Sequence, residues 1–144
     1  QRARVLGAFR GYRKNRKLFT DYPDGVVWHR VILDSDDFKR LKYIAYSYWN
    51  ELTQGSRRPL DAVSVIRSGR EVFEVSNKPA LAGAEAVRSG TVFGPIIVVT
   101  PDPKSDLVIL EGHGRATVYA LAGEDAYQRI HALLGLSPGF ASWL

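Results

Sequence analysis

The sequence predicts a single compact α+β domain in which a small mixed sheet is flanked by helices. Apolar, β-branched runs predict strands at 26–33, 96–100 and 107–110, and helical patterns lie between them. Strands and helices do not alternate strictly, which favours α+β over a doubly wound α/β fold. A chain of 144 residues is long enough for one domain to bury a core without cross-links.

The first half of the domain is expected to contain one strand, one long helix and two short strands. Residues 26–33 are rich in β-branched and aromatic side chains and predict the strand. Ser35 can cap the following helix, which apolar residues at steps of three and four extend to about Gly55. The stripe consists of Phe38, Leu41, Ala45, Tyr48 and Leu52. Two short strands are predicted at 61–66 and 71–75.

A helix and a hairpin follow. Ser76 or Asn77 can cap the helix, and Gly90 closes it. The strand at 96–100 is nearly all β-branched, which predicts burial of both its faces. A turn with two prolines returns the chain, so that 107–110 is expected to pair with this strand.

The last quarter of the chain is predicted to be mostly short elements. A helix is expected at 117–122, where Gly123 breaks the pattern. Residues 126–134 fit either a last strand or a short helix. Regular structure is expected to end at 135–139, with aromatic residues docking the tail.

Composition limits the classes of function. The sequence contains no cysteine, which excludes a thiol nucleophile and cysteine-ligated metals and favours a reducing compartment. No apolar run approaches the roughly 20 residues that span a bilayer, and the arginine-rich start has no hydrophobic signal core. We therefore expect a soluble, cytoplasmic protein that has no membrane partner.

Basic residues are concentrated at the N-terminus. Seven of the 20 precede Asp21, which leaves 13 basic against 15 acidic residues for the rest of the chain. We therefore distinguish a basic arm, residues 1–20, from a domain formed by residues 21–144. The arm could contact nucleic acid or another polyanion. The alternative is a solvated terminus that packs through its apolar residues.

The segment Leu107–Ala122 carries the strongest chemical signal. Its apolar strand leads into a polar, glycine-bearing turn and then into a helix, so that Glu111, His113 and Arg115 lie at the mouth of a helix N-terminus. Unpaired backbone N–H groups at such a terminus, together with the helix dipole, favour an anion. The sequence therefore predicts a phosphate site here.

Several known phosphate and metal motifs do not fit. A dinucleotide fingerprint would need a third glycine where Thr117 stands, and only 27 residues follow. No Walker sequence GxxxxGK followed by Ser or Thr occurs, and the three histidines lack HExxH spacing. The chain also lacks a GxSxG elbow.

Residues 77–134 contain, in order, a predicted helix, the segment SGTVFGPIIVV, a turn, the segment LVILEGHGRATVYALAG and a brief terminal element. This order resembles the core of the ParB/sulfiredoxin superfamily. The motif most resembles the free serine kinases, whose D-G-H-x-R corresponds to Glu111-Gly112-His113-Gly114-Arg115 with Glu for Asp. Sulfiredoxins have a catalytic cysteine where this chain has His113, and chromosome-partitioning ParB proteins bind CTP through G-E-R-R, which this chain lacks.

The resemblance implies that this turn and helix N-terminus hold nucleotide phosphates. The implied phosphate-binding residues are Gly112, His113, Gly114, Arg115, Ala116 and Thr117. His113 would donate to a phosphate or assist transfer, and Glu111 would hold Mg²⁺ or act as a base. The alternative for Glu111 is a structural acid that pairs with Arg115. Glu51 is a further catalytic candidate if the fold brings it to the turn.

Two functions remain open on the sequence. The first is a nucleotide-binding ParB-like domain that uses ATP or a related nucleotide with Mg²⁺, as a small-molecule kinase or a nucleotide hydrolase. The second is a non-catalytic nucleic-acid-binding or regulatory module that uses the basic arm. Tyr43, Tyr46 and Trp49 could form a base-stacking or ligand wall, and core packing is the alternative.

Overall fold

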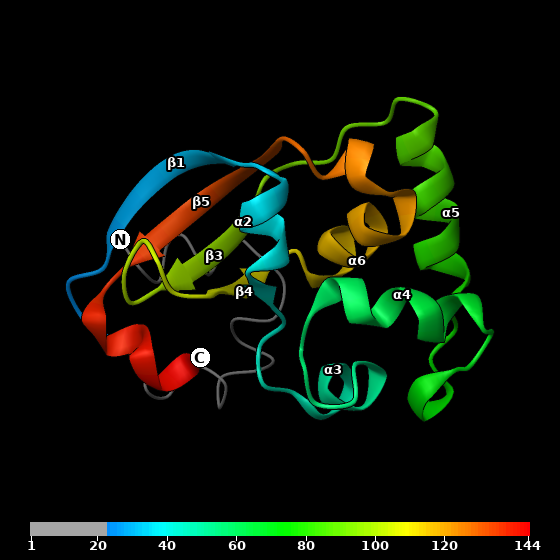
Figure 1. Ribbon diagram of the computed structural model, residues 1–144, viewed down its shortest axis with the longest axis horizontal. Coiled ribbons are helices and arrows are strands. Elements are labelled where there is room, and N and C mark those ends of the chain that lie inside the picture. Colours follow the sequence, from blue (N-terminus) through cyan, green and yellow to red (C-terminus); the bar gives the residue numbers. More distant parts are fainter. Residues whose placement is uncertain (1–22) are drawn as a thin grey trace.

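The computed structural model describes residues 23–144 of the protein, so the predicted basic arm lies outside the described residues. The described chain forms one α+β domain, as predicted. A five-stranded mixed sheet has the strand order β1-β5-β3-β4-β2. Figure 1 shows the sheet in one half of the molecule and α3, α4, α5 and α6 in the other.

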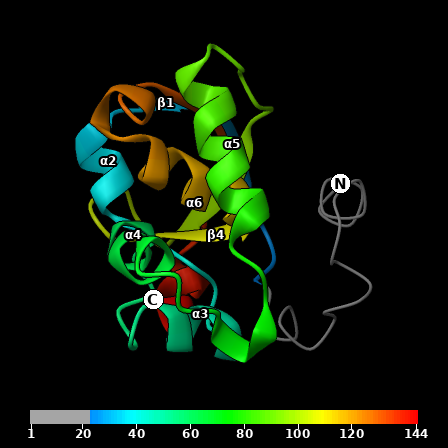
Figure 2. The same ribbon diagram turned by 90° about the vertical axis from the view of Figure 1, so that its right-hand side faces the viewer.

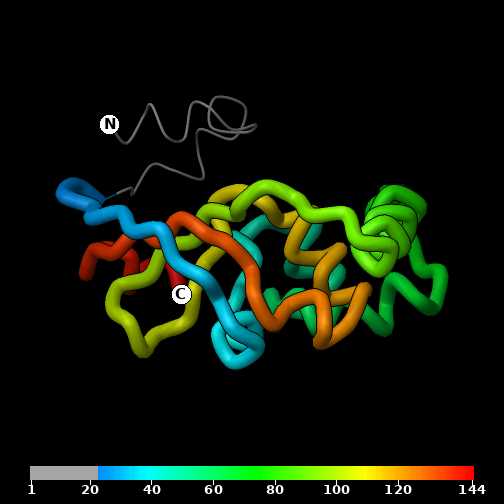
Figure 3. Tube along the Cα trace, turned by 90° about the horizontal axis from the view of Figure 1, so that it is seen from above, coloured from blue at the N-terminus to red at the C-terminus, as the bar shows by residue number. Residues whose placement is uncertain are grey.

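The sheet is built from the strands β1 (Val27–Leu33), β2 (Leu41–Lys42), β3 (Ile96–Thr100), β4 (Leu107–Glu111) and β5 (Ile130–Leu136). The pairs β1–β5 and β3–β4 are antiparallel, whereas β3–β5 and β4–β2 are parallel. The first and last strands of the described chain therefore lie side by side, as Figure 3 shows. The predicted strand at 26–33 and the predicted hairpin of 96–100 with 107–110 are confirmed.

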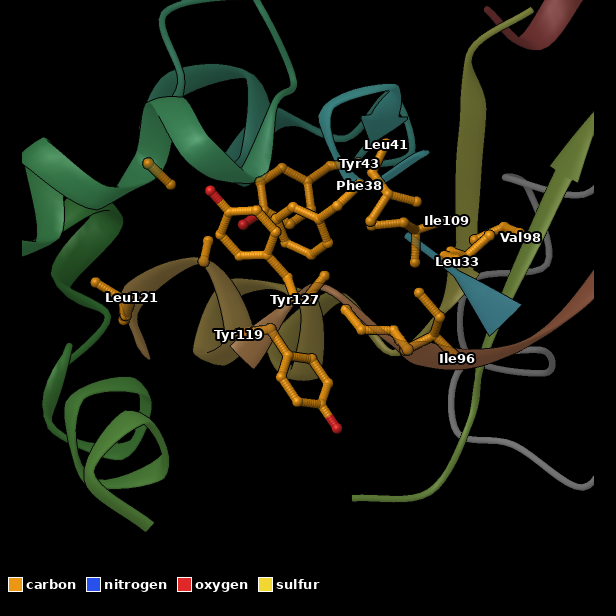
Figure 4. Packing of buried hydrophobic residues seen from close by; sticks show 14 of the residues in the cluster. Leu33, Phe38, Leu41, Tyr43, Ile96, Val98, Ile109, Tyr119, Leu121 and Tyr127 are labelled. Atoms are coloured by element: carbon orange, nitrogen blue, oxygen red, sulfur yellow. The ribbon is translucent and has the colours of Figure 1, made fainter. Parts of the chain in front are cut away.

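All five residues of β3 are buried, which confirms the prediction from its β-branched run. Alternate residues of this strand face two hydrophobic clusters. Ile96 and Val98 join the larger cluster beneath the helices, and Ile97 and Val99 join a smaller one with Phe140. Figure 4 shows Ile96, Val98 and Ile109 of the sheet in the same cluster as the aromatic side chains of Phe38 and Tyr127.

Five helices lie in the described chain: α2 (Ser35–Lys39), α3 (Ser47–Leu52), α4 (Pro59–Arg67), α5 (Lys78–Arg88) and α6 (His113–Ala122). Helix α6 contributes six buried residues and packs between α4 and α5 (Figures 1 and 2). Three 3₁₀ segments complete the described chain: η2 (Val72–Glu74), η3 (Glu124–Ala126) and η4 (Pro138–Trp143). No helix within residues 23–144 is both long enough and apolar enough to cross a membrane.

The long helix predicted from Ser35 to Gly55 is wrong. Asp34, not Ser35, is the N-cap, and its side chain forms a reciprocal capping box with Asp37. The helix ends at Lys39 because the chain then pairs Leu41 with Leu107 in the parallel β2–β4 ladder. Of the residues that suggested one stripe, Phe38, Leu41 and Leu52 are buried, and they come from α2, β2 and α3. Tyr48 is only partly buried, and Ala45 is exposed between β2 and α3.

The two short strands predicted between residues 61 and 75 are also wrong. The segment 61–66 lies in α4, where Pro59 occupies the first turn and Ala62 and Ile66 are buried one turn apart. The segment 71–75 contains η2, in which Phe73 and Glu74 both have positive φ. Six residues with alternating apolar character fit a helix face as well as a strand, so the local pattern was ambiguous.

The predictions for the last quarter need smaller corrections. The helix expected at 117–122 begins four residues earlier, at His113, so that this histidine belongs to the first turn of α6 and not to the preceding loop. The segment 126–134 is resolved as the end of η3 followed by β5. β5 ends at Leu136, within the predicted limit of 135–139, and Phe140 is fully buried, as its predicted docking requires. The prediction missed the 3₁₀ segment η4, which carries Phe140.

Candidate functional site

A cavity of about 530 Å³ lies beside the N-terminal part of α6. Its walls come from α3, α4, the segment 75–77, α5, Phe93 and α6. Its volume is within the range of about 300–1,000 Å³ that is usual for small-molecule sites. The lining residues are Tyr48, Trp49, Ile66, Val75, Ser76, Asn77, Pro79, Ala80, Gly83, Phe93, Gly114, Arg115, Thr117 and Val118.

The lining is mainly apolar and aromatic. The rings of Tyr43 and His113 stack on Trp49 and hold it in place. Their ring centroids lie 4.1 Å and 5.4 Å, respectively, from that of Trp49. Tyr48 meets Trp49 edge to face at 4.7 Å. Of the predicted aromatic wall, Trp49 lines the cavity, Tyr43 is fully buried behind it and Tyr46 is exposed.

The N-terminus of α6 forms one end of this cavity. Gly112 is the N-cap and has φ of +99°, and its carbonyl accepts the first helical hydrogen bond from Ala116 at 2.9 Å. No side chain caps the helix, and its first turn contains no acidic residue. The N–H groups of an uncapped first turn have no intrahelical partner and carry the positive end of the helix dipole. Gly114 and Arg115 of this turn line the cavity.

Arg115 is positioned by the loop before β3. Its Nη1 donates to the carbonyl oxygens of Gly94 at 3.2 Å and Pro95 at 2.6 Å. Its Nη2 lies 3.9 Å from Oε1 of Glu111. A guanidinium group has five N–H donors, so these contacts fix its plane and leave it able to contact an anion. The side chain is 29 % exposed, and this cation therefore remains accessible.

Both ring nitrogens of His113 form hydrogen bonds with main-chain groups. Its Nε2 accepts a hydrogen bond from the Ile44 N–H at 3.3 Å, so Nδ1 carries the proton and donates to the backbone of Ile109. Desolvation lowers the pKa of His113 to about 4, against the smaller opposing effect of the Ile109 hydrogen bond. The imidazole is therefore neutral at pH 7, and it connects the first turn of α6 to β4 and to the segment after β2.

A buried hydroxyl chain fixes the same turn from the other side. Tyr43 is fully buried, and its hydroxyl donates to Oγ1 of Thr117, which itself donates to the His113 carbonyl oxygen at 2.8 Å. Burial raises the pKa of the Tyr43 phenol, so this group stays protonated. Thr117, predicted as a phosphate ligand, thus has its hydroxyl committed to the internal structure of α6.

This chain predicts an asymmetry between two conservative variants. Thr117→Val leaves the buried Tyr43 hydroxyl without an acceptor and is expected to lower the free energy of unfolding by about 1–3 kcal/mol. Tyr43→Phe removes the donor and keeps the Thr117–His113 bond, so we expect a loss of about 1 kcal/mol. Urea unfolding of both variants measures the difference. Equal losses, or a larger loss for Tyr43→Phe, would contradict the proposed direction of the chain.

The two candidate carboxylates occupy different places. Glu111 ends β4, one residue before the N-cap of α6. It does not line the cavity itself, but it lies near Arg115, which does, and this proximity agrees with the structural alternative for Glu111. Glu51 does not line the cavity: its carboxylate pairs with Arg70 at 3.0 Å on the surface of α3, and both side chains are about half exposed. Within residues 23–144, no group of three acidic or histidine side chains could hold a metal ion.

Gly112, His113 and Ala116, the remaining predicted phosphate-binding residues, do not line the cavity. Gly112 is buried, and Ala116 is fully buried on the core side of α6. The structure also adds residues that the sequence did not indicate as a site, namely Asn77, Phe93 and Gly83. Asn77 had a local signal, since it precedes Lys78-Pro79 at a helix start, but that signal predicts a cap and not a cavity wall.

Comparisons with models of protein families, with curated proteins and with solved structures give no match for this chain. The resemblance to the ParB/sulfiredoxin superfamily therefore stays a prediction that rests on the motif and its order of elements.

Proposed function

We propose that this protein is a nucleotide-binding domain of ParB-like type that uses ATP or a related nucleotide with Mg²⁺, as a small-molecule kinase or a nucleotide hydrolase. The observation that supports this proposal best is the cavity whose end is formed by the uncapped first turn of α6 and by Arg115. An aromatic wall suits a planar base, and the helix terminus suits its phosphates. The cytoplasm, where nucleoside triphosphates are abundant, is the compartment that this proposal requires.

The proposed roles follow from position. Gly114 and Arg115 would contact phosphate oxygens through backbone N–H groups and the guanidinium group. His113 would act mainly by position, since both its nitrogens are already engaged. Glu111 is the acidic residue next to this turn, and one carboxylate together with phosphate oxygens and water is an ordinary set of ligands for Mg²⁺.

The proposed chemistry is phosphoryl transfer. An acceptor hydroxyl, or water in a hydrolase, would form a bond to the γ-phosphorus while the bond from that phosphorus to the β–γ bridging oxygen breaks and the nucleoside diphosphate leaves. As the alternative to holding Mg²⁺, Glu111 would accept the proton of the attacking hydroxyl. Arg115 would neutralise charge on the transferred group.

Gly114→Glu separates helix stability from anion binding. A Cβ at Gly114 meets no atom within 4 Å, so the side chain fits without rearrangement. A carboxylate in the first turn should stabilise α6 by about 0.3–1 kcal/mol through the helix dipole while it repels a phosphate. We expect the melting temperature to be unchanged or higher, and the stabilisation by Mg-nucleotide to be lost.

The matched control is Gly114→Ala, which adds the same Cβ without the charge. It should keep the stabilisation by Mg-ATP that thermal shift measures across ATP, ADP, CTP and GTP. Arg115→Ala should lose it. Unchanged nucleotide affinity in Gly114→Glu would refute a phosphate site at this terminus.

The alternative, a non-catalytic nucleic-acid-binding or regulatory module, is favoured by the seven basic residues before Asp21. It predicts DNA or RNA binding that weakens steeply with salt and that disappears when residues 1–20 are deleted. Binding of nucleic acid together with no response to any nucleotide would favour this alternative over the first proposal.

A further inference from the structure

Asn77 is a buried amide whose hydrogen-bonding capacity is only partly used. The residue is 7 % exposed and lines the cavity. Its Nδ2 donates to the carbonyl oxygen of Arg70 at 2.8 Å, and its side chain makes no capping bond to α5 although Asn77 is the N-cap. Its Oδ1 and the second N–H of Nδ2 have no partner among residues 23–144. Buried polar groups are nearly always satisfied, so this side chain indicates a ligand.

The contact with Arg70 also fixes which way the amide faces. A main-chain carbonyl only accepts hydrogen bonds, so the nitrogen of the amide must be the atom beside it. The amide therefore cannot flip to exchange its oxygen and nitrogen. A ligand at Asn77 meets a fixed acceptor, Oδ1, and the N–H on the same side of the amide is the donor beside it when Arg70 takes the N–H that points away from Oδ1. Its complement is an amino group beside a ring nitrogen.

The surroundings of Asn77 favour a flat aromatic ring. Trp49 and Phe93 line the same cavity, and Trp49 is held by its stacking on Tyr43 and His113. Gly83 of α5 adds little bulk to the wall, and a Cβ there would lie 2.6 Å from Cγ2 of Val118. A side chain at this position would therefore push into the neighbouring helix, and the glycine keeps the α5–α6 wall close and flat.

We propose that Asn77 selects a base whose Watson–Crick edge carries an exocyclic amino group beside an unprotonated ring nitrogen, an edge that adenine and cytosine share. Oδ1 accepts from the amino group, and the second N–H of Nδ2 donates to the ring nitrogen. Hypoxanthine, guanine and uracil present a carbonyl oxygen where the amino group would be, which places that oxygen against Oδ1. This inference rests on the proposed nucleotide site and names the base class that the site accepts.

The test compares pairs of ligands that differ at this one group. Calorimetric titration of the whole chain with ATP and ITP, and with CTP and UTP, all with Mg²⁺, measures the two ratios. We expect each amino nucleotide to bind at least about tenfold more tightly than its keto partner, because one well-formed pair of hydrogen bonds to a base discriminates by about this factor. Equal affinities within both pairs would overturn the inference and leave the proposed nucleotide site intact.

Two protein variants locate the discrimination. Asn77→Leu should bring both ratios to about one while the weaker binding that remains still depends on Arg115. Ser64→Ala, at an exposed position of α4 that does not line the cavity, should keep the ratios of the native protein. If Asn77→Leu does not fold by circular dichroism, the ligand pairs on the native protein still decide. Discrimination that persists in folded Asn77→Leu would assign the selection to another residue and refute the proposal.

A further pair of ligands tests the role of Asn77 separately from the proposed phosphate site. Adenosine and inosine, which have no phosphate, are titrated at high concentration into the same protein. Binding of adenosine over inosine, with no gain for the triphosphates, would keep the role of Asn77 and refute the phosphate site. No binding by any nucleotide or nucleoside would overturn both.

Discussion

Gly112→Ala is expected to lower the free energy of unfolding by about 3 kcal/mol, through two independent penalties. Gly112 has φ of +99°, a backbone conformation that costs an L-residue roughly 1–2 kcal/mol. A Cβ there would also lie 2.5 Å from Cγ2 and 3.3 Å from Cα of Ile96. Because Ile96 is fully buried in the central strand, neither Ile96 nor residue 112 can shift to relieve the clash without loss of core packing. Urea unfolding followed by circular dichroism measures the loss.

Gly90→Ala is the matched control. Gly90 has φ of +102°, almost the same as Gly112, but a Cβ at this position meets nothing within 4 Å. It should therefore show only the backbone penalty of roughly 1–2 kcal/mol. If Gly112→Ala cost no more than Gly90→Ala, the close approach between the N-cap of α6 and β3 would not contribute. The site prediction adds that Gly112→Ala weakens nucleotide binding, because it displaces the first turn of α6.

Lowering the pH from 6.5 to 4 is expected to reduce the stability of the protein by about 3 kcal/mol through His113 alone. Burial lowers the pKa of His113 from 6.5 to about 4. Between these values the unfolded chain binds a proton that the folded protein does not, so the free energy of unfolding falls as the pH falls. Well above pH 6.5 both states are neutral, and well below pH 4 both are protonated, so the slope from this residue fades beyond the two pKa values.

His113→Gln isolates this contribution. Urea unfolding at intervals from pH 4 to pH 7.5 should show a flatter slope for His113→Gln than for the native protein, whatever the absolute stability of the variant. His131→Gln, at an exposed position of β5, removes a histidine elsewhere in the fold and serves as the control. The same slope in the native protein and in His113→Gln would contradict a buried neutral imidazole at the start of α6.

The secondary structure could be predicted from the sequence where local signals and burial agree. The β-branched run of β3 and the Pro–Gly limits of α5 are local signals that hold in any context, and both elements lie where the sequence places them. The residues 38–52 show the opposite case. Their helical spacing correctly marks several buried residues, but Arg40 donates to the Pro103 and Ser105 carbonyls and the chain enters the sheet beside it.

The candidate site was predicted only in part. The sequence placed a helix N-terminus after the strand and its glycine-bearing turn, but it put the first helical residue at 117 and not at His113. It did not locate Asn77, Trp49 and Phe93 together, since these come from α3, the start of α5 and the loop before β3. No regular spacing of these residues in the sequence indicates that they lie close together in the fold. Glu51 was named on residue type alone, and the fold pairs it with Arg70.

The sequence by itself determined the α+β class, the buried central hairpin and the succession of strand, glycine-bearing turn and helix over 107–122, because each depends on conformational preferences within a few residues. The tertiary structure alone decided that residues 35–55 divide between two helices and a strand, that His113 is neutral and that Asn77 lines a shared cavity with only one N–H of its amide hydrogen-bonded. The physical reason is that periodicity marks which side chains are buried, whereas only packing decides which neighbours bury them.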